Sequence, residues 1–281
     1  MDRPMMIVTS LEELRSARLL LDGTVGFVPT MGYLHEGHVS LARRAKEECE
    51  SVVASIFVNP TQFGPTEDLS KYPRNLERDL RLLEAAGVDL VWTPTPEVMY
   101  TTGYGTWVEV EGLTKPLEGA SRPGHFRGVT TVVSKLFNAV QPTKAYFGQK
   151  DAQQAAVIRK MTRDLDFPVE VVVCPTVREA DGLAMSSRNS YLSPEERQAA
   201  TVLFRSLSAA RSAYERGERS AEPLRGIMSG VIASEPLAKM QYVSVADYDT
   251  LEELETVTGK TLLSLAVLLG KTRLIDNFVL G

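Results

Sequence analysis

The sequence predicts an α/β protein with a doubly wound parallel sheet, followed by a smaller α+β domain. Short apolar runs alternate with helical patterns as far as Cys174, which is typical of βαβ units. The run Ser51–Val58 is continuously apolar and rich in β-branched residues, as expected for a strand buried on both faces. After about Asp181, helical patterns are followed by strand-like runs with no helix between them. We therefore expect two domains, residues 1–180 and residues 181–281.

Each element of the first domain has its own signal. Ser10 and Glu13 have the spacing of a capping box, so a helix is expected to begin there. Gly87 is expected to end another helix. Strands are predicted at Met5–Thr9, Val25–Thr30, Ser51–Val58, Val88–Trp92, Thr106–Glu111, Lys144–Phe147 and Val169–Cys174. Further helices are predicted at Glu36–Glu50, Asn75–Ala86, Val129–Val140 and Ala152–Leu165.

The second domain is predicted to combine two helices with three strands. Ser193 followed by Pro194 is a typical helix start, and the pattern predicts one long helix to about Arg216. A second helix is predicted over Ala221–Ala233. Strands are predicted at Tyr242–Asp247, Thr261–Leu268 and Thr272–Val279.

Charge and composition exclude several classes of protein. The chain has 281 residues and a formal net charge of −5. Residues 1–181 carry 20 basic and 24 acidic side chains and the rest carry 11 and 12, so neither part offers a basic face for nucleic acid. Two cysteines, Cys49 and Cys174, lack metal-binding spacing and suit a reducing compartment. No long apolar run suggests a signal peptide or membrane span, so we expect a cytoplasmic protein.

Histidine is rare and clustered. The chain has three histidines, and His35 and His38 lie where a strand is expected to end and a helix to begin. Residues three apart share a helix face, and free amides at a helix start attract anions. Two imidazoles there can donate hydrogen bonds to phosphate oxygens. The alternatives are two ordinary surface histidines or a zinc site, which lacks a third ligand.

Two further segments suit phosphate binding. Gly148-Gln149-Lys150-Asp151 follows a predicted strand, where a lysine can reach a phosphate; a solvated Lys-Asp pair is the alternative. In Gly182–Asn189, two serine hydroxyls and an arginine suit a triphosphate, although a plain interdomain turn is the better explanation of this segment when taken alone. The chain contains neither GxxxxGK[ST] nor GxGxxG, which disfavours P-loop kinases and nicotinamide enzymes.

Uncharged amides mark a second kind of pocket. Asn59 and Gln62 follow the buried strand, and Gln153 and Gln154 follow Asp151. Amides suit a substrate with hydroxyls and a carboxylate, and surface glutamines are the alternative. The segment Arg122–Gly128 can be read as a gate, an anion-binding loop or a plain turn.

These residues resemble a known family. His35-Glu36-Gly37-His38 resembles the HxGH signature of the nucleotidyltransferase superfamily, and Met185-Ser186-Ser187-Arg188 resembles its KMSKS-type element with arginine in place of lysine. PTMGYLHEGH, FVNPTQF, RPGHFRGV, YFGQKDAQQ and GLAMSSRNSYLS occur in that order, a combination similar to the pantoate–β-alanine ligases. The resemblance covers the whole chain and implies a Rossmann-like first domain, with the second domain closing over the active site.

The resemblance also implies a reaction. Pantoate attacks the α-phosphate of ATP, pyrophosphate leaves, and the amine of β-alanine then attacks the pantoyl adenylate to give pantothenate and AMP. The family uses Mg²⁺ with the nucleotide; because phosphates and water supply most of its ligands, no protein ligand is assigned. A homodimer is implied, with no nucleic-acid or membrane partner.

Site residues follow from the same resemblance. His35, His38, Lys150 and Arg188 are implied to be catalytic, with His38 the usual proton donor and Lys150 at the α-phosphate. Pantoate is implied to bind Gln62 and Gln154, with Gln62 also near β-alanine and with Asn59 and Thr30 in support. The ATP site is implied to comprise Met31, Gly32, Tyr33, Leu34, His35, Glu36, Gly37, His38, Gly148, Gln149, Lys150, Asp151, the backbone of Val177, Met185, Ser186, Ser187 and Arg188.

One departure and three rival functions remain. Gln149 stands where many members of the family carry glutamate, and it is expected to point outward. A true nucleotidyltransferase of the same fold would be shorter and would lack the Asn59–Phe63 pocket. A non-catalytic nucleotide-binding protein would not need two histidines at the phosphates, and a tRNA-binding protein is opposed by the acidic charge.

Overall fold

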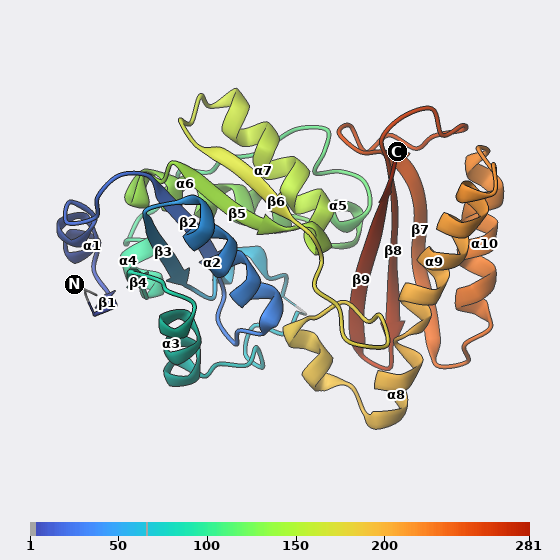
Figure 1. The fold of residues 1–281 in the computed structure, drawn as a ribbon, viewed down its shortest axis with the longest axis horizontal. Helices are drawn as coiled ribbons and strands as arrows, with labels where there is room; N and C mark the ends of the chain where they lie inside the picture. The colour runs from blue at the N-terminus through green and yellow to red at the C-terminus, as the bar shows by residue number, and fades with distance from the viewer. Residues whose placement is uncertain (1–3, 66) are drawn as a thin grey trace. The chain divides into compact units, whose positions relative to one another are not determined.

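A computed structural model describes residues 4–65 and 67–281 (Figure 1). The chain divides into two compact units. The first comprises the residues up to Gly148 together with Gln153–Cys174, and the second comprises Gln149–Ala152 and Pro175–Gly281. The short segment after Gly148 therefore belongs with the C-terminal part of the chain.

The first unit is built on a six-stranded sheet in which every pairing is parallel (Figure 1). Its strand order is β1-β4-β3-β2-β5-β6. The strands are β1 (Met6–Val8), β2 (Val25–Thr30), β3 (Ser51–Ile56), β4 (Leu90–Trp92), β5 (Lys144–Gly148) and β6 (Glu170–Cys174). The doubly wound parallel sheet predicted from the sequence is confirmed.

Helices cover both faces of this sheet. The helices of the first unit are α1 (Leu11–Arg18), α2 (Glu36–Glu48), α3 (Leu76–Ala85), α4 (Pro96–Met99), α5 (Glu118–Ser121), α6 (His125–Val140) and α7 (Ala152–Asp164), with the 3₁₀ turn η1 (Pro60–Gln62). A second 3₁₀ turn, η2 (Gln149–Asp151), belongs with the second unit. Side chains alternate along each strand: Val53 of β3 joins the core formed with α1, α6 and α7, whereas Val52 and Ala54 join the core formed with α2 and α3. Both faces of β3 are buried, as its apolar run predicted.

The second unit combines an antiparallel sheet with helices. Strands β7 (Ala238–Asp247), β8 (Thr261–Leu269) and β9 (Thr272–Leu280) pair in that order, which leaves β9 at an edge. Helices α8 (Pro194–Ala199), α9 (Val202–Glu215) and α10 (Ala221–Ala233) and the 3₁₀ turn η3 (Ser187–Tyr191) complete it. One core contains side chains of α9, α10, β8 and β9. Across the described residues, no helix has the length and apolarity to span a membrane.

The predicted strand Thr106–Glu111 is wrong. This segment forms no strand ladder in the described structure. The hydroxyl of Thr130 on α6 donates to the carbonyl of Val108, and the amide of Val108 donates to the hydroxyl of Thr131. Helix side chains thus satisfy polar groups that a neighbouring strand would otherwise satisfy.

Two helix predictions also need correction. The long helix to Arg216 is two helices, α8 and α9, because the hydroxyl of Thr201 donates to the carbonyl of Gln198 and competes with the helical ladder. Helix α6 begins at His125 rather than Val129, directly after Gly124 in the left-handed region at φ 82°. A glycine is suited to that conformation because it has no Cβ.

Helix α6 makes a backbone contact that only glycine allows. A Cβ at Gly128 would stand 2.4 Å from the carbonyl oxygen of Thr61 and 2.7 Å from the amide nitrogen of Gln62. Gly230 of α10 has no atom within 4 Å of such a Cβ. We expect Gly128→Ala to lower the free energy of unfolding by about 2 kcal/mol, whereas Gly230→Ala should raise it by about 0.5–1 kcal/mol through helix propensity. Denaturant unfolding of both variants measures this, and equal effects would contradict the close contact.

Candidate active site

The topology of the first unit indicates where a ligand binds. Strand β2 lies between β3 and β5, and the chain runs outward from β2 in one direction before it returns to β5. In open parallel sheets, ligands bind outside the carboxyl ends of the strands where the order reverses. Here these ends are Thr30 of β2 and Gly148 of β5.

The turn after β2 is held by a buried carboxylate. The amides of Tyr33 and Leu34 donate to the two oxygens of Asp79, at 2.6 and 2.8 Å. Asp79 lies on α3 and is 1% exposed. Gly32 has φ 82° and Tyr33 has φ 51°, so two successive residues adopt the left-handed region. A Cβ at Gly32 would stand 3.2 Å from Asp79 Oδ2, so a larger residue would crowd the carboxylate.

Neighbouring side chains satisfy other backbone groups of the same turn. The Gly32 amide donates to the hydroxyl of Thr30, which in turn donates to the carbonyl of Ser55. Arg78 donates to the carbonyl of Leu34. Thr30 therefore shapes the turn through its hydroxyl, in addition to the substrate role expected from the sequence.

The two histidines cap helix α2 with their Nδ1 atoms. His35 Nδ1 accepts from the amide of Gly37 at 3.1 Å, and His38 Nδ1 accepts from the amide of His35 at 3.4 Å. A nitrogen that accepts carries no hydrogen, so both neutral rings carry their proton on Nε2. The ring centroids lie 4.1 Å apart. The start of α2 thus presents two adjacent Nε2–H donors, while Glu36 pairs with Arg43 along the helix.

Asn59 and Gln62 form a buried amide pair in the first unit. Asn59 Nδ2 donates to Gln62 Oε1 and to the carbonyl of Gly128, both at 3.1 Å, and its oxygen accepts from the hydroxyl of Tyr100. Gln62 Nε2 donates to the sulfur of Met31 at 3.1 Å. A thioether is a weak acceptor, so this buried N–H₂ group is poorly paired and suited to a substrate oxygen.

The two neighbouring glutamines of α7 have different environments. Gln153 is buried and is engaged by the backbone of residues 113–118: it donates to the carbonyls of Leu113 and Pro116 and accepts from the amide of Glu118. Its role is therefore structural. Gln154 is half-buried, and it is the one of the two that the resemblance assigned to pantoate.

The third histidine, His125, contacts the backbone carbonyl of Gln62. His125 Nδ1–H donates to the carbonyl of Gln62 at 2.8 Å, and His125 Nε2 accepts from Arg122. Arg122 also makes two bonds to the carboxylate of Glu67. Burial, aided by the nearby Arg122 guanidinium, lowers the pKa of His125 from 6.5 to about 4. Of the two arginines in the Arg122–Gly128 segment, Arg122 is thus paired within the first unit, and the Arg127 guanidinium lies over the Trp107 ring, 4.4 Å from its centroid.

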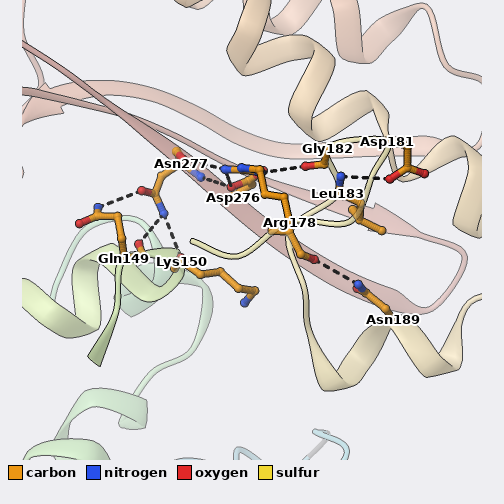
Figure 2. A network of polar contacts seen from close by, with 10 residues as sticks. Gln149, Lys150, Arg178, Asp181, Gly182, Leu183, Asn189, Asp276 and Asn277 are labelled. Atoms are coloured by element: carbon orange, nitrogen blue, oxygen red, sulfur yellow. Dashed lines mark hydrogen bonds and ion pairs between the residues drawn. The ribbon is translucent and has the colours of Figure 1, made fainter. Parts of the chain in front are cut away.

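The second unit holds the lysine segment on its edge strand. Asn277 of β9 donates from Nδ2 to the carbonyls of Gln149 and Lys150, both at 2.9 Å (Figure 2). The side chain of Gln149 donates to Asn277 Oδ1 and accepts from the hydroxyl of Tyr248. The expectation that Gln149 points outward is therefore wrong. Lys150 Nζ lies 3.5 Å from Asp151, so the Lys-Asp pair considered from the sequence is present.

A hairpin leads to the serine-rich segment. The amide of Met185 donates to the carbonyl of Val177. Next to this pair, Arg178 and Ala184 form an antiparallel β-bridge. Arg178 makes a two-pronged ion pair with Asp276, at 2.6 and 2.9 Å, and also donates to the carbonyl of Gly182 (Figure 2). Beyond the hairpin, Ser186 caps η3 by accepting from the amide of Arg188, and Ser187 is buried.

Four supporting residues were not predicted from the sequence: Asp79, Arg178, Asp276 and Asn277. Their partners lie far away along the chain, and no local motif marks them. Only Asp276 and Asn277 had a signal in the sequence: they are two adjacent polar residues within an otherwise largely apolar strand, which suggests that they have buried polar partners.

Metal binding has no dedicated cluster in the described chain. Among residues 4–65 and 67–281, no group of three or more histidine, cysteine, aspartate or glutamate side chains is placed to hold a metal ion. No protein ligand of a metal ion is therefore assigned.

Fold and site together define an HxGH-type α/β nucleotide-binding protein, with a Rossmann-like sheet whose β2–α2 turn carries two histidines. A sequence model described as Pantoate-beta-alanine ligase matches residues 6–279. The chain belongs to this family of enzymes, which join pantoate to β-alanine.

Individual relatives are similar to this protein over nearly the full chain. A pantothenate synthetase of Roseiflexus sp. (strain RS-1) is 63% identical over 98% of this chain and 99% of that protein. The crystal structure of pantothenate synthetase from Thermus thermophilus has a TM-score of 0.94 at 51% identity, covering 98% of this chain and 99% of that one. A Francisella tularensis pantoate-beta-alanine ligase, complexed with beta-gamma ATP and beta-alanine, has a TM-score of 0.80 at 35% identity and covers 98% and 97%.

Asp79→Asn tests how the histidine turn is held. An amide can accept from only one of the two backbone N–H groups and turns its own N–H₂ toward the other, so we expect about 3 kcal/mol lower stability. The amides of Tyr33 and Leu34 should also exchange with solvent faster. Glu77→Gln on the same helix, where the side chain is 84% exposed, is the matched control. Unchanged exchange at both amides in Asp79→Asn would contradict this support.

His125 predicts a pH dependence of stability. Between pH 6.5 and about 4 the unfolded chain takes up a proton at this residue that the folded protein excludes. Stability present above pH 6.5 is therefore lost as the pH falls, by about 2 kcal/mol between pH 7 and pH 5. Urea unfolding at both pH values should show that His125→Gln is less pH-sensitive than the native protein by this amount. The same pH dependence in both proteins would refute the assignment.

Proposed function

We propose that this chain condenses pantoate with β-alanine in an ATP-dependent reaction that passes through pantoyl adenylate and releases AMP and pyrophosphate. Family membership over residues 6–279 supports the overall reaction. The observation that carries the proposed mechanism is the paired histidine cap of α2, which places the ring proton of both imidazoles on Nε2.

The first step requires charge stabilisation more than proton transfer. A pantoate carboxylate oxygen attacks the α-phosphorus, the bond to the bridging oxygen breaks, and negative charge grows on the departing pyrophosphate. His35 and His38 donate through Nε2–H to phosphate oxygens, and Lys150 steadies the α-phosphate as a point charge. Donors fixed before the reaction need no reorganisation in the transition state.

The pantoate pocket is proposed around Gln62. Its N–H₂ group can exchange the weak thioether acceptor of Met31 for a pantoate oxygen. Asn59 fixes the opposite end of the Gln62 amide and so selects which end faces the substrate. Gln154 and Thr30 complete the proposed pocket, and β-alanine is placed next to Gln62, where its amine attacks the acyl carbon and displaces AMP.

The second unit is proposed to supply the remaining contacts with the nucleotide. Ser186, Ser187 and Arg188 hold the β- and γ-phosphates, the backbone of Val177 lies near adenine, and this domain closes over the active site. Mg²⁺ bound to the nucleotide neutralises part of the phosphate charge. We also propose that the protein is a homodimer and that it is cytoplasmic. The two cysteines of the chain, Cys49 and Cys174, form no disulfide and are buried, as suits a reducing compartment.

Product analysis tests the proposed function. We expect AMP, pyrophosphate and pantothenate in equal amounts only when ATP, pantoate and β-alanine are all present. Folded protein that makes no pantothenate under these conditions would overturn the proposal.

His38→Ala tests the assigned role of the histidine cap. Removal of one donor to developing charge should slow single-turnover adenylate formation by at least about a hundredfold. Glu47→Ala, an exposed change on the same helix, is the control and should retain the native rate. A near-native rate in His38→Ala would remove this residue from the mechanism.

A further inference from the structure

The carboxamide of Asn277 occupies an unusual place for an edge-strand side chain. It is 4% exposed and makes three hydrogen bonds, all to Gln149 or Lys150. Gln149–Ala152 follows β5 in the chain, yet it belongs to the compact unit that contains β9. Asn277 is therefore a principal link between this short segment and the C-terminal sheet (Figure 2).

The chemistry of the contact requires an amide. Two successive backbone carbonyls, those of Gln149 and Lys150, face the same nitrogen, which must supply two hydrogens. Asparagine provides both from one N–H₂ group and leaves its oxygen to accept from the Gln149 side chain. A carboxylate of the same shape would instead set negative oxygens against two carbonyl oxygens.

Asp276, the residue before Asn277 on β9, anchors a different segment of the chain. Successive side chains of a strand point to opposite sides, and Asp276 pairs with Arg178 while Asn277 holds Lys150. Asp276 Oδ1 also accepts the amide of Asn277 at 2.7 Å. Arg178 begins the hairpin that leads to Ser186–Arg188, so two neighbouring residues of β9 hold both cationic segments of the proposed site.

We infer that Asn277 is a positioning residue for Lys150, because it fixes the backbone from which the lysine side chain departs. This inference rests on the proposed function, in which Lys150 contacts the α-phosphate. We call the two hydrogen bonds from Asn277 Nδ2 to the carbonyls of Gln149 and Lys150 the clamp. The clamp sets the position of the Lys150 ammonium group relative to the hairpin that leads to Arg188, before the nucleotide binds. Displacing a group that acts on a transition state by about 1 Å can lower the rate by up to about a hundredfold.

The inference is tested in two genetic backgrounds. In otherwise native protein, Asn277→Asp should lower kcat for pantoyl-adenylate formation at least about tenfold, with the KM for pantoate nearly unchanged. In a Lys150→Ala background, followed by single-turnover assay at high enzyme concentration, Asn277→Asp should cause no further loss. Tyr248→Phe, which removes one bond to the Gln149 side chain but leaves the clamp, should stay within about twofold of the native rate.

Each contrary result has a defined meaning. Equal loss in both backgrounds would show that Asn277 supports the fold in general and would overturn the inference, as would a native kcat in Asn277→Asp. If Asn277→Asp does not fold, Asn277→Ser, which keeps one donor and adds no charge, decides the question in the same two backgrounds. If the native protein makes no pantothenate, the proposed function itself fails and the inference fails with it.

Discussion

The proposed chemistry depends on how the turn between β2 and α2 satisfies its backbone amides. The residues of this turn and the first residues of α2 have N–H groups without partners in regular structure. The Asp79 carboxylate accepts two of them, and the side chains of His35 and His38 accept two more. The same bonds that complete the backbone fix the tautomer of both imidazoles. The hydrogen bonds that stabilise the local fold therefore also orient the two Nε2–H donors that are proposed to bind phosphate.

Anion binding in this protein has to be local. The formal net charge is −5, so the overall field does not attract a nucleotide. The groups suited to phosphate or to the pantoate carboxylate are instead individual donors, each fixed in place by a buried partner. In the first unit, Asp79 holds the histidine turn and His125 holds the carbonyl of Gln62. In the second, Asn277 and Asp276 hold the segments that lead to Lys150 and Arg188.

Sequence patterns predicted the elements whose signals are local. Apolar runs located the sheet strands, and the spacing of His35 and His38 at a helix start marked the turn that the structure confirms as a capped helix terminus. The pattern failed at Thr106–Glu111, where α6 hydroxyls replace a strand partner. It could not identify Asp79 or Asn277, because their partners lie 45 and 127 positions away and only the folded chain brings them together.

The central claim is that the pantoate carboxylate itself attacks the α-phosphorus of ATP. Pantoate labelled with oxygen-18 in its carboxylate tests this directly, because an adenylate transfers one carboxylate oxygen to the nucleotide when the amine displaces AMP. We expect mass spectrometry to find the label in AMP and none in pyrophosphate. Unlabelled AMP, with the displaced oxygen-18 found in pyrophosphate or in water instead, would contradict the account.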